Sequence, residues 1–493
     1  MPPVPVGLDG VVLLLETGWE HSRDAFLPSS PPMLAAACSR GEFLQGDLSG
    51  EPETLLWVAE AAAAYRPRHP QASSLYKLLE TFYEQVKSLW EERFEPRYGP
   101  WRGYFDPAVA RYLDCGVLER GLARVFCDSC RHNFVVAFSC KGRGLCPSCA
   151  AKRGAKLAAF LEQHVLEPVD HVQWVFTIPK MLRPYFLHHR ELLAELCRAA
   201  YETVAELMSA AVSPDRRLRP GFVAVVQTFN SDLRFNPHIH AIASRGAWDE
   251  QDNWYPLPFL DARSAELRFR TKVLAFLRER DLIDEDRVAL LLSWGENTGF
   301  SVDNSVRVDA NDAAGLARLA RYLLRSPLSL ERLTWDESTH EIVYVPKRSQ
   351  GHDDADPTTA ERFDPLELIA RLLLHIAQPR LHLVRYFGAY ASVVRARRRE
   401  LTREDLPAPP SPQATGPSQD SPPPPDPPAL KERLNERRRG WAELIRRVYE
   451  VDPLRCPRCG AEMRIIAFIL DPAVLRRILD HSAAEGSDPR APP

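Results

Sequence analysis

Hydrophobic residues follow two spacings along the chain, and each spacing predicts one kind of secondary structure. Apolar positions three or four residues apart, typical of a helix packed on one face, occur in residues 55–94, 191–208, 265–282, 313–325 and 365–376. Runs of β-branched and aromatic residues predict strands at 171–179, 221–229, 235–242 and 301–308, with a hairpin at 332–345. Strands that pair in hairpins and alternate with helices predict an α+β fold, in which helices cover an antiparallel sheet.

Composition divides the chain into six segments. Residues 1–53 mix proline, glycine and serine without periodicity, so we expect a poorly structured extension there. Proline dominates between Pro407 and Pro428, which excludes a packed core and predicts a linker at 401–429. The other four segments are a helical segment, a cysteine-rich module, the sheet domain and a small C-terminal helical module, at residues 54–110, 111–156, 165–400 and 430–493.

Charge is distributed unevenly along the 493 residues, although the formal net charge is only −3. Basic residues far outnumber acidic ones at 120–156, and residues 380–399 contain arginines but no acid. Such patches favour a phosphate-backbone partner, with a solvated surface as the alternative. The apolar run at 11–15 is too short to span a bilayer and follows no basic segment, so we expect no membrane insertion and a cytoplasmic protein.

Ten cysteines in a reducing compartment are more typical of metal sites than of disulfides. Two CxxC pairs, Cys127 with Cys130 and Cys146 with Cys149, predict one tetrahedral four-thiolate shell holding a structural Zn²⁺. Cys115 and Cys140 remain open as residues that surround the ligands without binding the ion, as alternative ligands or as parts of another site.

The same cysteine-rich module carries basic side chains, which predict that it binds DNA, whereas a purely structural brace is the alternative. The candidate DNA-binding residues here are Lys141, Arg143, Lys152 and Arg153. A third pair, Cys456 and Cys459, is half a zinc site whose other ligands must come from elsewhere, such as His481 or another chain.

The segment FNPHIHAI places His238 and His240 on one face of a strand, because alternate side chains of an extended chain point the same way. Two adjacent imidazoles can bind a metal ion, although they also suit a half-exposed polar face. A turn near residues 230–234 brings Gln227 of the preceding strand close to the pair. Two imidazoles and an amide oxygen suit Mg²⁺ or Mn²⁺ bound to a phosphate, while Gln227 could equally face solvent.

Tyr322 lies at the edge of the apolar face of the helix expected at 313–325. Arg318 and Arg325 are four residues before and three residues after it, and Arg321 is adjacent to it in sequence. A phosphate bound by these guanidiniums would lie against the tyrosine hydroxyl, and nearby positive charge favours the nucleophilic phenolate. Tyr322 is therefore a candidate nucleophile, although a tyrosine at this position can also simply cover the edge of a core.

Together these residues resemble the rolling-circle insertion-sequence transposases, which are HUH nucleases with an N-terminal cysteine-rich zinc-binding domain. The likeness covers residues 65–481 and rests on YLDCGVLERGLARVFCDSC, SCKGRGLCPSCAAKR, QWVFTIPKMLRPY, FNPHIHAI, ARYLLRSPLSLERL, HLVRYFGAYA and CPRCGAEMRIIAFILDP. It implies that His238 and His240 bind the divalent cation and that Tyr322 attacks the scissile phosphodiester. Some members have a second tyrosine four residues earlier. That position here is Arg318, so the chain resembles a single-tyrosine enzyme.

The sequence thus predicts a transposase that cleaves and rejoins single-stranded or melted DNA at insertion-sequence ends through a 5′-phosphotyrosine, with DNA and a second copy of the chain as expected partners. A replication initiator or relaxase would use the same chemistry. A metal-dependent phosphohydrolase would cleave without a covalent step, and a zinc-dependent regulator would bind DNA without catalysis. A histidine-triad hydrolase fits poorly, because Ile242 occupies the third alternating position.

Overall fold

The computed structural model describes residues 69–212, 217–257, 259–295, 298–339, 341–345, 361–404, 455–456 and 458–484. The extension expected at 1–53, most of the proline-rich linker and the start of the C-terminal module lie outside the described residues. The described chain forms two compact units that do not follow the boundaries expected from composition. The larger unit combines His69–Val117 with the chain from Ser139, and the smaller unit combines Leu118–Phe138 with the described residues near the C-terminus.

An antiparallel sheet forms the centre of the larger unit, which confirms the α+β fold expected from the sequence. Its middle strands are β3 (His171–Thr177), β5 (Phe235–Trp248) and β4 (Arg219–Phe229). Beside them lie β12 (Val384–Gly388), β7 (Ser301–Asp303), β8 (Arg307–Val308) and β6 (Trp254–Pro256). Gln227 on β4 pairs with His238 on β5, so the turn between these strands sets their register as expected.

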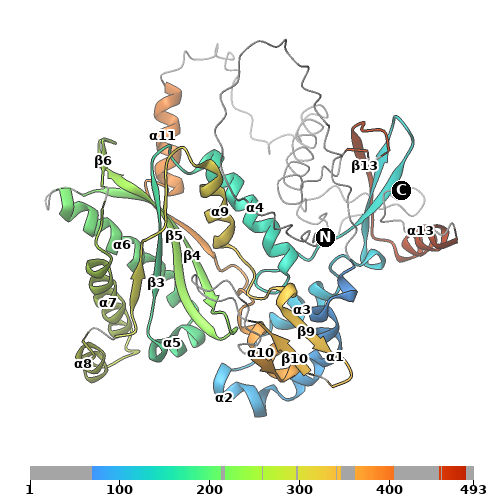
Figure 1. Ribbon diagram of the computed structural model, residues 1–493, viewed down its shortest axis with the longest axis horizontal. Helices are drawn as coiled ribbons and strands as arrows, with labels where there is room; N and C mark the ends of the chain where they lie inside the picture. Colours follow the sequence, from blue (N-terminus) through green and yellow to red (C-terminus); the bar gives the residue numbers. More distant parts are fainter. Residues whose placement is uncertain are drawn as a thin grey trace, which may run out of the picture. The chain divides into compact units, whose positions relative to one another are not determined.

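Helices cover both faces of this sheet (Figure 1). Large buried side chains such as Trp174, Phe176 and Phe269 fill the face covered by α5 (Arg183–His188), α6 (Leu192–Val212), α7 (Ala262–Glu279) and α8 (Glu285–Ser293). The opposite face packs against α4 (Pro147–His164) and α9 (Ala313–Leu323). Ile239 and Ala241 of β5 point into the core beneath α5 to α8, whereas Ile242 points into the core beneath α4 and α9. Because side chains alternate along a strand, His238 and His240 lie on the same face as Ile242 and point toward α9.

A third hydrophobic core of the larger unit joins segments that the sequence assigned to different domains. The helix α1 (Ser74–Ser88) packs against α10 (Pro365–Leu374), near the small sheet of β9 (Leu333–Asp336), β10 (Glu341–Tyr344) and β11 (Glu361–Phe363). Further helices of the unit are α2 (Glu95–Tyr98), α3 (Phe105–Leu113) and α11 (Ser392–Glu404). The helical segment expected at 54–110 is therefore part of this unit from His69 onward, not a separate domain.

The smaller unit is a three-stranded sheet built from two described segments that lie far apart in the sequence. Its strand order is β13-β1-β2, from β13 (Met463–Ile469), β1 (Leu122–Cys127) and β2 (Asn133–Ala137), and α13 (Pro472–Ala484) follows β13. The C-terminal helical module expected at 430–493 contributes a strand to this sheet, because a two-stranded hairpin is marginal alone and β13 completes it. No described helix is both long and apolar enough to cross a bilayer.

Candidate active site and metal centres

The two histidines of β5 lie side by side on the sheet face beneath α9. Their ring centroids are 4.9 Å apart, and both side chains are buried, with 7% exposure for His238 and 5% for His240. Among the described residues, no carboxylate, cysteine or further histidine joins the pair to make a three-ligand group. The two imidazoles are therefore the nitrogen donors that this part of the structure offers to a cation.

Burial keeps both imidazoles neutral, which is the form that binds metals. The pKa of His238 falls to about 4, mainly through burial, with the hydrogen bond to Asn236 opposing the fall and the charges of Arg325 and Arg183 adding to it. The pKa of His240 also falls well below its usual value, through burial and through the neighbouring His238 and Arg325. Neither histidine needs to lose a proton at neutral pH before it can coordinate a cation.

Hydrogen bonds to Nδ1 decide which ring nitrogen each histidine can offer. Nδ1 of His238 donates to the Asn236 carbonyl at 2.8 Å, which leaves Nε2 with a lone pair. Nδ1 of His240 lies 3.0 Å from Nε2 of Gln173, and exchanging the oxygen and nitrogen of that amide gives Nδ1 an acceptor and leaves Nε2 of His240 with a lone pair for a cation. Sequence patterns did not identify Gln173, a buried glutamine on β3 that pairs with Ile242 on β5.

Tyr322 lies directly beside this pair. Its ring is 5.4 Å from the His240 ring in an edge-to-face arrangement, and its side chain is partly exposed. The guanidinium of Arg325 stacks 4.7 Å from the centroid of the Tyr322 ring, so a cationic group also faces the tyrosine. The structure thus brings together His238, His240, Tyr322 and Arg325, which the sequence proposed separately.

The two arginines within α9 are exposed. Arg318 is 71% exposed and lies 3.8 Å from Asp312 at the start of the helix, and Arg321 is also exposed. Arg325 follows Leu323, the last residue of α9, and the joint grip of the three arginines on a phosphate stays a prediction. Arg318 and Arg321 occupy the outer surface of α9, where they remain predicted DNA contacts.

Gln227 has contacts that differ from those of a metal ligand. Its Nε2 donates to the carbonyls of Tyr322 and Leu323, each at 3.2 Å, and its Oε1 accepts from Nε of Arg325 at 3.1 Å. At the end of α9 the Tyr322 carbonyl also accepts from the Arg325 N–H at 3.3 Å, whereas the Gln227 amide supplies the donor for the Leu323 carbonyl. We correct its role accordingly: Gln227 anchors the end of the Tyr322 helix to β4.

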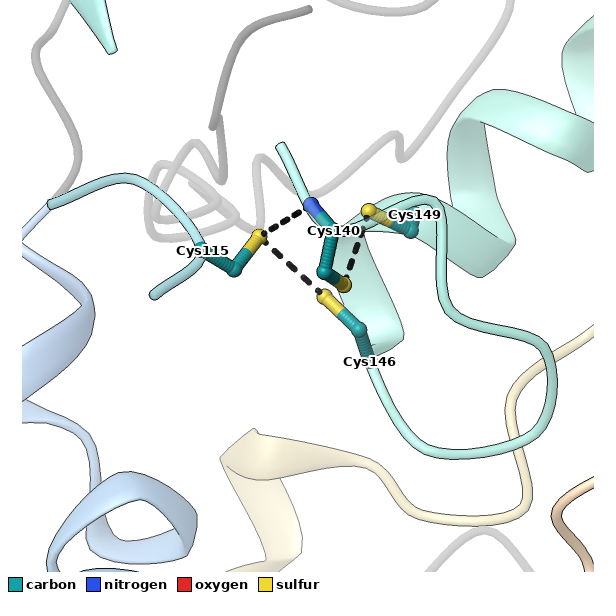
Figure 2. A group of neighbouring side chains, drawn as sticks. All are labelled: Cys115, Cys140, Cys146 and Cys149. Carbon is teal, nitrogen blue, oxygen red and sulfur yellow. Dashed lines mark hydrogen bonds between the residues drawn. The ribbon is translucent and has the colours of Figure 1, made fainter. Parts of the chain in front are cut away.

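Four cysteines of the larger unit form one candidate metal centre, shown in Figure 2. Sγ of Cys115 is 3.9 Å from that of Cys146, and Sγ of Cys140 is 3.6 Å from that of Cys149. A tetrahedron with Zn–S bonds of about 2.3 Å has sulfur atoms about 3.8 Å apart, so this group has the dimensions of a zinc site. Cys115 and Cys140 are thus full members of a shell in which the sequence left them open.

A second group of four cysteines lies in the smaller unit. Sγ of Cys127 is 3.6 Å from that of Cys459, and Sγ of Cys130 is 3.5 Å from that of Cys456. Each CxxC motif here is followed by a residue with positive φ, Arg131 at 65° and Gly460 at 72°. His481 does not belong to this group.

The expectation that Cys127, Cys130, Cys146 and Cys149 share one ion is therefore wrong. The two CxxC pairs lie in different compact units, and each pair completes its shell with other cysteines. Both groups contain four thiolates and leave no open position, which is typical of structural zinc.

The basic residues of the cysteine-rich segment are less exposed than expected. Lys152 is buried on α4 at 9% exposure, and Arg143 donates to the carbonyls of Leu381 at 2.6 Å and Gln378 at 2.7 Å. Lys141 and Arg153 are half-buried. These four residues are therefore integrated into the larger unit and do not form a free basic surface.

Comparisons with known proteins agree with this arrangement. Residues 221–398 match the family model described as a putative transposase, and residues 85–178 match the transposase zinc-binding domain. The transposase for insertion sequence element IS801 of Pseudomonas savastanoi pv. phaseolicola is 26% identical over 383 residues, which cover 73% of this chain and 83% of that protein. The putative transposase y4qJ of Sinorhizobium fredii (strain NBRC 101917 / NGR234) is 25% identical over 312 residues, covering 58% and 76%.

No solved structure matches the chain significantly. The transposase match contains His238, His240 and Tyr322, and the zinc-binding match contains the complete cysteine group of the larger unit. The order of the two domains is the order expected from the sequence motifs. The chain therefore belongs to the rolling-circle insertion-sequence transposases that carry an N-terminal zinc-binding domain.

Proposed function

We propose that this transposase nicks and rejoins single-stranded DNA at the ends of its insertion sequence through a covalent bond between Tyr322 and a 5′-phosphate. The observation that carries the proposal is the 5.4 Å separation of the Tyr322 and His240 rings on one sheet face. A nucleophile and a cation site must share one phosphodiester, and these two residues are close enough to do so.

The residues present fit a divalent cation such as Mg²⁺ or Mn²⁺. His238 and His240 would hold it through Nε2, since Nδ1 of each ring is engaged by Asn236 or Gln173. A cation bound there supplies Lewis-acid polarisation of the scissile phosphate. Arg325 adds a fixed positive charge beside the Tyr322 ring and would stabilise negative charge that develops on the phosphate oxygens.

The tyrosine step conserves the energy of the phosphodiester. The Tyr322 oxygen forms a bond to phosphorus, the bond from phosphorus to the 3′-oxygen breaks, and the leaving strand ends in a 3′-hydroxyl. A 3′-hydroxyl can later attack the phosphotyrosine and release the enzyme, so no nucleoside triphosphate is consumed. Arg318 stands four residues before Tyr322, so a single tyrosine would carry both the cleavage and the rejoining steps.

The test uses single-stranded oligonucleotides tiled across the DNA that flanks the coding sequence, with Mn²⁺ and the full-length chain. We expect an SDS-resistant adduct that retains a 3′-fluorophore, while a 5′-fluorophore appears on a shorter free strand. Tyr322→Phe should abolish the adduct, and Tyr386→Phe, which changes a half-buried tyrosine on β12, should not.

Cleavage that persists without an adduct in Tyr322→Phe would refute the covalent mechanism and indicate the metal-dependent phosphohydrolase. A 5′-fluorophore in the adduct would refute the proposed polarity of the attack. A replication initiator or relaxase would form the same adduct, and similarity to two transposases favours transposition over these functions.

A further inference from the structure

A small cavity lies beside the end of α9, within the larger unit. Its wall combines the loop between Cys140 and Cys146, the end of β4, the residues that follow Tyr322 and the segment that follows α10. Its volume is about 70 Å³. A single water position needs about 10–15 Å³, so there is room for about five water-sized groups, comparable to a phosphate with its oxygens.

The charge around this cavity is entirely positive. Four arginines line it, and none of the lining residues is an aspartate or a glutamate. They come from separate parts of the chain: Arg143, Arg153, Arg190 and Arg325. Arg143 fixes the wall through its bonds to two carbonyls, and Arg153 has neither a hydrogen bond nor an ion pair with any described residue.

Arg190 has an unusual environment for a cation. It is only 8% exposed, one terminal nitrogen donates to the Leu374 carbonyl at 2.8 Å, and its guanidinium lies 4.4 Å from the Phe235 ring centroid. Its Nε has no hydrogen-bond partner among the described residues, and it forms no ion pair with a described carboxylate. A buried charge without a counterion costs several kcal/mol, so the fold retains a cation that an external anion would stabilise.

Arg325 connects the cavity to the catalytic tyrosine. It lines the cavity, stacks on Tyr322 and lies 5.1 Å from the Phe229 ring centroid, while Gln227 holds its Nε. The cavity is therefore adjacent to the place where the scissile phosphate would lie.

We propose that this cavity binds a backbone phosphate of the DNA strand, next to the linkage that Tyr322 attacks. This inference rests on the proposed function, because it takes the bound phosphate to belong to the DNA strand that Tyr322 cleaves. The guanidiniums of Arg153, Arg190 and Arg325 contact the phosphate. Arg143 fixes the loop between Cys140 and Cys146, which forms part of the cavity wall. The first zinc centre thus shapes part of the DNA site.

The experiment measures binding alone, with the zinc-loaded full chain, no added divalent cation and a fluorescein-labelled single strand of about 20 nucleotides, from about 50 to 300 mM salt. Arg153→Gln should weaken binding about tenfold at low salt, the usual effect of losing a charge-assisted hydrogen bond. It should also reduce the slope of log affinity against log salt by about 0.7, the value for one phosphate contact on a single strand. Arg198→Gln, an equal change of charge on the exposed side of α6, should alter neither quantity.

Arg190→Met provides a second variant with effects of opposite sign. It should reduce the salt slope in the same way, yet raise the melting temperature of the free protein, because an unpaired buried cation is removed. Unchanged slopes in both Arg153→Gln and Arg190→Met would overturn the proposal. A thermal melt with inorganic phosphate gives a second way to overturn it. If phosphate raises the melting temperature of the wild type but not of Arg153→Gln, and oligonucleotide binding is the same in both, the cavity is a site for free phosphate and not for DNA.

The two proposals fail separately. If the wild-type chain forms no tyrosine adduct but the slopes fall as expected, the phosphate cavity stands and the covalent mechanism does not. If the adduct forms and the slopes are unchanged, only the cavity is refuted.

Discussion

The cysteine groups predict that each chain binds two zinc ions, with partners that are distant in sequence. Replacing both Cys115 and Cys140 with alanine leaves two thiolates in the first group, and replacing both Cys456 and Cys459 does the same in the second. Each double variant should therefore lose one of the two ions. The combined quadruple variant should lose both, although the CDSC and CPSC pairs remain intact.

The size of the effect follows from the geometry of the groups. The distances between paired sulfur atoms are 3.9 and 3.6 Å in the first group and 3.6 and 3.5 Å in the second, close to the roughly 3.8 Å expected around a tetrahedral zinc ion. Binding of structural zinc is worth about 10–16 kcal/mol in small zinc domains, which exceeds or equals the whole stability of a typical domain. Loss of the second ion should thus unfold the smaller unit, while the larger unit keeps its own melting transition.

Zinc per chain, measured by elemental mass spectrometry after gel filtration, checks this prediction. We expect ratios of about two for the wild type, one for each double variant and zero for the quadruple variant. A quadruple variant that still holds one ion would show that Cys127, Cys130, Cys146 and Cys149 share a shell after all. Calorimetry of the Cys456 and Cys459 double variant then separates loss of the smaller unit from general unfolding.

Three further predictions concern residues of the larger unit. Gln227→Leu should lower the free energy of unfolding by about 1–3 kcal/mol in urea titrations, because the Leu323 carbonyl loses its donor and Nε of Arg325 loses its acceptor, and an unchanged stability would contradict this anchoring role. Burial lowers the pKa of His171 and of His375 to about 4, so the unfolded chain takes up protons first as the pH falls below about 6.5. Each of these two histidines should therefore lower the free energy of unfolding by roughly 1.4 kcal/mol as the pH falls from about 7.5 to about 5.5. A free energy of unfolding that stays constant over this range would refute the prediction. Gly144→Ala should lower the free energy of unfolding by more than about 2 kcal/mol in a urea titration, since Gly144 has a φ of +86° and the new Cβ would lie 2.0 Å from the His375 carbonyl oxygen. Gly103→Ala, which has open space around the new Cβ, should be nearly neutral in the same titration.

Local periodicity was enough to predict the elements that carry the candidate active site. The strands expected at 171–179 and 221–229 and the helix expected at 313–325 correspond to β3, β4 and α9. The alternation in FNPHIHAI placed both histidines on one face, because the period of a strand is a local property. The position of Tyr322 beside His240 could not follow from either pattern alone, since it depends on which sheet face α9 covers.

Long-range partners were the part that sequence could not predict. Gln227 was expected to hold a cation, yet its amide is used by the end of α9, which only the packed helix reveals. Gln173 carries no motif and becomes visible only through the register of β3 with β5. The basic run at 120–156 looked like one surface, but its residues divide between two compact units.

The cysteines show why spacing misleads most where ligands are shared across a chain. A CxxC pair specifies a turn that presents two thiolates to one ion, but it contains no information about which second pair completes the shell. Strand β13 pairs with β1, and this register places Met463 opposite Cys127 and so brings the C-terminal pair beside the CDSC turn. The CPSC pair is left to Cys115 and Cys140, and the loop that these residues fix supplies Gly142, Arg143 and Gly144 to the cavity beside Tyr322. The two zinc centres therefore have different consequences: one closes a separate sheet, and the other shapes the wall of the proposed DNA site.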